Sequence, residues 1–149
     1  MEGALVTALT APSARPRVVE ACCGLVDAEV AARSGLSGFA VRAGYKAVRA
    51  IKPTMVRDAL DSLLPDFAAA LDPLHAEAPG SAFEPHLCAN ADRAALALLG
   101  VTDRRAEKSK SGAVKKTYAG LRGIAQAQLR TSVPALARTL APFVPAAPP

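Results

Sequence analysis

The sequence has no tryptophan, and aromatic residues make up only 4% of its 149 residues. It has three cysteines, an odd number with no CxxC pair, so we expect buried free thiols rather than a disulfide framework. No apolar run approaches the roughly 18 residues that a membrane-spanning helix needs. The N-terminus also lacks the positively charged segment of a secretory signal. We therefore expect a cytoplasmic protein without a transmembrane segment.

Alanine and leucine supply much of the hydrophobic content, which is 51% of the chain. Both are strong helix formers, whereas the β-branched and aromatic residues that are typical of strands are sparse. A chain of this length can bury a full core without disulfides or metals. The composition therefore predicts an all-α fold, a single compact domain over residues 1–144 followed by a disordered Pro/Ala tail at 145–149.

Apolar residues recur at helical spacing, and we expect about six to eight short-to-medium helices. Pro65 and Gly100 mark expected helix ends, because proline and glycine interrupt helices. The stretch 27–42 predicts a helix–Gly turn–helix corner at Ser34–Gly38, since a glycine in the left-handed conformation commonly ends a helix. We expect this corner and a helix over about 113–130 to lie at the centre of the fold.

The corner also fits the spacing of a helix-turn-helix motif, with Ala31, Gly35 and Val41 at the small, glycine and apolar positions. Its second helix would then enter the major groove of DNA. The residues that should meet base edges, Gly38–Ala40, offer almost no hydrogen-bonding side chains. The first helix also shows no break near Gly24. A purely structural corner accounts for the same residues, so the motif stays an alternative.

Charge is distributed unevenly in this chain of net charge +5, because all 13 acidic residues precede Lys108 while seven of the 18 basic residues follow Glu107. Such asymmetry favours an anionic partner for the basic segments. A solvated helix surface kept soluble by lysines is the alternative. The candidate anion- or nucleic-acid-binding residues are Arg42, Lys46, Arg49, Lys108, Lys110, Lys115, Lys116, Arg122 and Arg130.

The motifs of catalysis and cofactor binding are missing, since the sequence has no GxSxG, HExxH or Walker glycine loop. His75, His86 and Cys88 lack the ligand spacing of a zinc site. We therefore expect no enzymatic activity, no metal or other cofactor, and surface or helix-capping positions for both histidines. A helical carrier of a small apolar ligand or lipid is an alternative function, with a pocket between helices. Its candidate residues are Tyr45, Lys52 and Tyr118, and the two tyrosines also suit a helical core.

Short segments along nearly the whole chain resemble a family of uncharacterised bacterial proteins of actinobacterial type. The segments that carry the resemblance are Leu25–Val30, Ser34–Gly38, Gly44–Lys46, Ile51–Pro53, Leu63–Phe67, Ala70–Pro73, Leu98–Asp103 and Thr117–Arg122. The family has no assigned activity, so the resemblance implies no functional residue. From the residues themselves we predict a non-catalytic binding module for an anionic partner, with nucleic acid first and a membrane surface or an acidic protein next.

Overall fold

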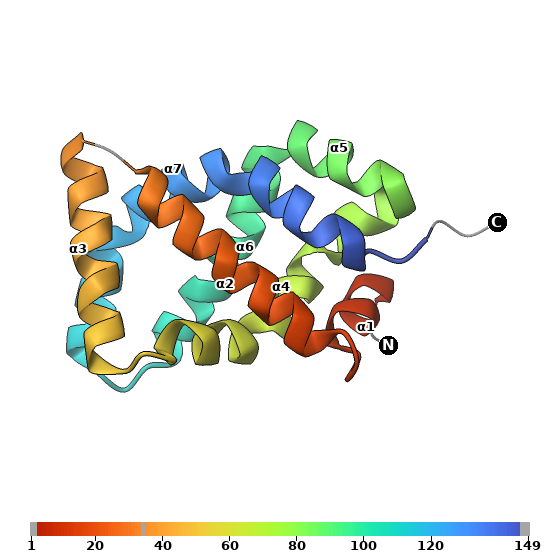
Figure 1. Ribbon diagram of the computed structural model, residues 1–149. Helices are drawn as coiled ribbons and strands as arrows, with labels where there is room; N and C mark the ends of the chain where they lie inside the picture. Colours follow the sequence, from red (N-terminus) through yellow and green to blue (C-terminus); the bar gives the residue numbers. More distant parts are fainter. Residues whose placement is uncertain (1–2, 34, 147–149) are drawn as a thin grey trace.

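The computed structural model describes residues 3–33 and 35–146, without the side chains of Ser37 and Val114 (Figure 1). Its α-helices are α1 (Ala4–Thr10), α2 (Arg15–Ala32), α3 (Gly35–Ile51), α4 (Met55–Glu77), α5 (Phe83–Ala89), α6 (Ala91–Lys108) and α7 (Gly112–Leu140). Two 3₁₀ helices, η1 (Gly80–Ala82) and η2 (Ala141–Phe143), are the other helical elements within the described residues. No strand occurs within the described ranges, so the predicted all-α class is confirmed. Ser34 of the expected corner and residues 147–149 of the expected tail lie outside the described residues.

The hydrophobic core is formed by α1, α5, the start of α2, the second half of α4, the first half of α6 and the C-terminal half of α7. Leu5, Leu9, Leu71 and Phe83 are among its largest fully buried side chains. Burying each of them contributes about 1.5–3 kcal/mol. No described residue of α3 belongs to this core, and α3 stands at the left edge of Figure 1, away from both chain termini. The expectation of a central corner is therefore wrong.

The peripheral position of α3 follows from the residues on the side that faces the neighbouring helices. Val41 and Tyr45 are half-buried on this side, but Ile51 at the C-terminal end of α3 is 76% exposed. The close approach of α3 to the end of α2 depends on Gly38, where a Cβ would lie 2.6 Å from the Arg33 carbonyl carbon. The inner side of α3 therefore has a glycine and only partly buried side chains, which are too few to form a separate hydrophobic core.

Two of the expected helix ends are continuous helix instead. α4 runs through Pro65 and α6 runs through Gly100. A proline inside a helix removes one hydrogen bond of the helical ladder. In α4, arginine side chains from α2 and α6 donate to the carbonyl oxygens just before Pro65, so contacts between helices replace the local interaction. Gly35, by contrast, has the left-handed φ of +74° that the turn requires.

The three cysteines are free, as predicted, but they are only half-buried. All three pack against the core from its margin. Burial raises the pKa of the Cys22 thiol to about 11, and it also raises the pKa of Cys23. A thiol with a raised pKa is a weak nucleophile at neutral pH. The positions of Cys22 and Cys23 are therefore those of small apolar residues at the edge of a core.

Candidate anion-binding surface

The basic side chains of α3 do not form one open stripe. Arg42 donates a hydrogen bond to the Arg33 carbonyl oxygen. The Arg49 guanidinium lies 3.5 Å from Asp27 Oδ1. Both arginines therefore point towards the second half of α2. Lys46 is exposed and makes no ion pair with a described residue, so it is the member of this predicted set that stays available to a partner.

The predicted arginines of α7 are engaged in ion pairs with α6. Arg122 donates from Nε and Nη2 to the two carboxylate oxygens of Asp103, at 2.9 and 3.0 Å. The Tyr118 hydroxyl donates to the same carboxylate at 2.6 Å. These donors hold the pKa of Asp103 at about 2. Arg130 Nε lies 2.7 Å from Asp92 Oδ1, so both arginines serve the packing of α7 on α6.

Four exposed lysines surround the connection between α6 and α7. They are Lys108, Lys110, Lys115 and Lys116, which we call the lysine joint. None of the four pairs with an acidic side chain in the described part of the chain, and the first turn of α7 carries no acid. The positive end of the α7 helix dipole adds to their field. The lysine joint is therefore the part of the predicted site where several positive charges lie together without an ion pair in the described part of the chain.

Each of the three residues proposed for a ligand pocket already contacts an acidic side chain. Tyr45 donates to the Asp27 carboxylate, Lys52 Nζ lies 2.8 Å from Asp58 Oδ2, and Tyr118 is bonded to α6 as described above. An open groove of about 850 Å³ lies elsewhere, along α1 and α4, and none of the three residues lines it. The three side chains are therefore engaged in contacts between helices.

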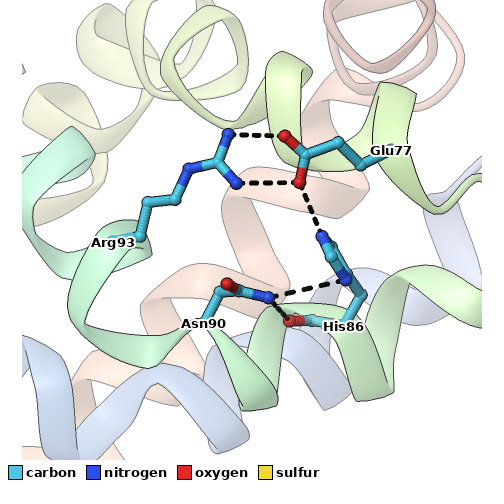
Figure 2. Close-up of polar contacts among 4 residues, drawn as sticks. All are labelled: Glu77, His86, Asn90 and Arg93. Atoms are coloured by element: carbon cyan, nitrogen blue, oxygen red, sulfur yellow. Dashed lines mark hydrogen bonds and ion pairs between the residues drawn. The ribbon is translucent and has the colours of Figure 1, made fainter.

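The sequence analysis missed a polar cluster at the meeting point of α4, α5 and α6, shown in Figure 2. Arg93 donates from Nη1 and Nη2 to the two Glu77 oxygens at 2.8 and 2.6 Å. His86 Nε2 lies 2.8 Å from Glu77 Oε1, and Asn90 Nδ2 donates to the His86 carbonyl oxygen at 2.8 Å. The Arg93 and His86 hydrogen bonds lower the pKa of Glu77 to about 2.

This cluster joins the ends of three helices. The two hydrogen bonds from Arg93 keep the Glu77 carboxylate ionised and orient both side chains. Because its members come from separate helices at irregular spacing, no periodic signal in the sequence could have identified them. We interpret the cluster as a structural clamp between α4 and α6.

The position of His75 corrects the prediction of surface or helix-capping positions for both histidines. His75 is 5% exposed, and its ring packs edge-on against Phe83 with centroids 5.5 Å apart. Its Nε2 has no hydrogen-bond partner among the described residues. The physical reason is the continuation of α4 through Pro73, which places His75 on the core side of the helix beside Leu71 and Leu74.

Comparison with known proteins gives a family but no activity. A family model described as "Family of unknown function (DUF6918)" matches residues 5–144. No curated protein and no solved structure matched the chain. The family match extends from α1 to the residue after η2, so it covers the core and the lysine joint together. In the described part of the chain, no helix is long and apolar enough to cross a membrane.

Proposed function

The chain belongs to DUF6918, a family of unknown function, and we propose that it is a non-catalytic module that binds an anionic partner. The binding surface is the lysine joint together with Lys46. The observation that supports this proposal is a contrast between two kinds of basic residue. The four predicted arginines bond to neighbouring helices, whereas the five predicted lysines are exposed and unpaired in the described part of the chain.

Nucleic acid is the first candidate partner, because its phosphates present a dense row of negative charges. A lysine ammonium binds phosphate as a point charge and does not read bases, so we expect binding without sequence preference. The corner adds little direct readout, since the exposed Phe39 and Ala40 carry no hydrogen-bonding side chains. The continuity of α2 from Arg15 to Ala32 also favours a backbone-binding module over a helix-turn-helix regulator.

Fluorescence anisotropy of a labelled DNA duplex, titrated at low and then moderate salt, tests the proposal. The test variant is Lys115→Gln/Lys116→Gln in the lysine joint. The matched control is Arg17→Gln/Arg138→Gln, which removes the same charge from two exposed arginines on the start of α2 and the end of α7. These elements lie towards the end of the molecule that holds the chain termini (Figure 1).

We expect the affinity of the wild-type protein to fall log-linearly with salt concentration. In a plot of log affinity against log salt concentration, each lost phosphate contact makes the slope shallower by about 0.9. The slope should therefore become shallower by about 2 in Lys115→Gln/Lys116→Gln and stay unchanged in Arg17→Gln/Arg138→Gln. An equal change of slope in both variants would contradict the assignment of DNA binding to the lysine joint. A protein that binds neither duplex DNA nor anionic vesicles at low salt would contradict the proposed function itself.

A further inference from the structure

The outward side of α3 is apolar. Helical spacing places Leu36, Phe39 and Ile51 away from the half-buried Val41 and Tyr45, and their exposed fractions are 92%, 67% and 76%. Leu36 and Phe39 lie one turn apart near the start of α3, and Ile51 lies at its other end. The residues between them are small and exposed, namely Ala40, Ala43, Gly44, Ala47 and Ala50. We call these eight residues the α3 face.

The surroundings of the α3 face are basic. α3 contains no acidic residue. Arg42 and Arg49 point towards α2, and Lys46 remains exposed at the border of the α3 face. In Figure 1, α3 and the start of α7 with its lysine joint lie at the same end of the molecule, opposite the two chain termini. An apolar face and a cluster of unpaired cations are therefore available at one end of the protein.

A second copy of the chain fits the α3 face poorly. The 17 residues of α3 span about 25 Å, and one side about 10 Å wide covers about 250 Å². A stable protein interface buries about 800 Å² per partner. Pairing two α3 faces would also place Lys46 against a surface without an acid to match it. A nucleic acid would satisfy the lysines but leave Leu36 and Phe39 without an apolar contact.

We propose that the α3 face binds the surface of an anionic membrane. In this arrangement α3 lies along the boundary between headgroups and acyl chains with Leu36, Phe39 and Ile51 inserted, while the lysine joint contacts lipid phosphates. A helix with apolar residues on one side and cations at its border combines apolar burial with attraction to anionic lipids. The inference rests on the proposed function, because it identifies the anionic partner as lipid.

Vesicle flotation with the full chain tests the inference. The probes are vesicles of phosphatidylcholine alone and vesicles of phosphatidylcholine with phosphatidylglycerol. Leu36→Ser/Phe39→Ser removes the apolar contribution, and Leu96→Ser is the control, because Leu96 is an exposed leucine on α6 (51% exposed). Lys115→Gln/Lys116→Gln removes charge from the lysine joint. Circular dichroism melting of each variant shows that the fold is retained.

We expect the wild-type protein to float with the anionic vesicles and not with the neutral ones. Leu36→Ser/Phe39→Ser should weaken this partition at least tenfold, since each inserted side chain loses a large part of its transfer free energy. Lys115→Gln/Lys116→Gln should weaken it about thirtyfold. Leu96→Ser should leave it unchanged.

The outcomes separate this inference from the proposed function. Flotation that is insensitive to Leu36→Ser/Phe39→Ser would overturn the inference and leave an electrostatic binder, as the proposed function states. Binding of duplex DNA without flotation would overturn the inference in favour of nucleic acid. A chain that binds neither probe would overturn both. Loss of flotation in Leu96→Ser as well would show general adhesion of exposed apolar groups, which contradicts a role for the α3 face.

Discussion

Arg15 Nη2 donates a hydrogen bond of 2.7 Å to the carbonyl oxygen of Asp61, the residue four positions before Pro65. In a regular helix that carbonyl accepts from the amide at position 65, and proline has no N–H to donate. Arg15 Nε also contacts Asp61 Oδ1 at 2.8 Å. Arg105 donates in the same way to the Ser62 carbonyl oxygen at 3.0 Å. Arg15 thus supplies the donor that Pro65 lacks, and Arg105 adds a contact to the next carbonyl, whose helical donor is the Asp66 amide.

Replacing Arg15 by methionine should lower the free energy of unfolding by about 1 kcal/mol, because the Asp61 carbonyl then loses its protein donor. The same change should cost less in a Pro65→Ala background, where the alanine amide donates to that carbonyl within α4. A double-mutant cycle by urea unfolding measures the difference, and we expect a coupling of at least about 0.5 kcal/mol. A coupling of zero would show that Arg15 contributes only through its ion pair.

The course of α4 shows why the helix boundaries were harder to predict than the fold class. The all-α class and the turn at Gly35 depend on composition and on one residue's backbone preference, so both could be read from the sequence. At Pro65 the donors to the neighbouring carbonyls are Arg15 and Arg105, which lie 46 and 43 residues away along the chain. Local patterns contain no information about such distant donors.

The candidate site was predictable to a similar degree. The absence of acids after Glu107 pointed to the four lysines of the lysine joint, which make no ion pair in the described part of the chain. The same pattern also suggested Arg122 and Arg130, which in the structure meet Asp103 and Asp92 of α6. Pairing across two helices depends on their relative rotation. A charge count along the chain does not contain that information.

The N-terminal helix α1 is capped by a residue of α4. Asp72 Oδ1 accepts the Leu5 backbone N–H at 3.0 Å, whereas the N-cap residue Gly3 has no side chain that could do so. Asp72→Ala should lower the free energy of unfolding by about 1 kcal/mol, the usual cost of a lost N-cap. Asp72→Asn keeps an acceptor oxygen and should retain most of the stability. Equal losses in the two variants, measured by urea unfolding, would exclude a capping role.

The clamp around Glu77 predicts a specific pH dependence. The folded pKa of Glu77 is about 2, below the ordinary value of 4.5, so its stabilising contribution is present above pH 4.5 and is lost as the pH falls through about 2. The stability difference between wild type and Glu77→Gln should therefore be constant at neutral pH and shrink steadily in acid. Urea unfolding across this range measures it.

Salt provides the control for the Glu77 prediction. The Glu77 and Arg93 side chains are 42% and 49% exposed, so added salt should reduce the difference between wild type and Glu77→Gln at neutral pH. A difference that stays constant from neutral pH to pH 2 would contradict the role of the ionised carboxylate. It would instead assign any stabilisation to packing of the Glu77 side chain.

Two phenylalanines distinguish the core from the α3 face. Phe83 is fully buried, whereas Phe39 is 67% exposed. Phe83→Ala should lower the free energy of unfolding by about 3–5 kcal/mol, because it removes a buried ring and leaves a cavity. Phe39→Ala should change it by less than about 0.5 kcal/mol, as expected for a surface position. Urea unfolding at two protein concentrations measures both effects.

Unfolding at two protein concentrations shows whether Phe39 packs inward, contacts a second copy or stays exposed on the α3 face. A large loss for Phe39→Ala at both concentrations would show that α3 packs inward in solution, which would leave no apolar face for a membrane. A loss that grows with protein concentration would indicate that a second copy covers Phe39. A small loss at both concentrations means that the ring adds little to the fold of the isolated chain. Leu36 and Phe39 can then be changed in the vesicle experiment without disturbing the core.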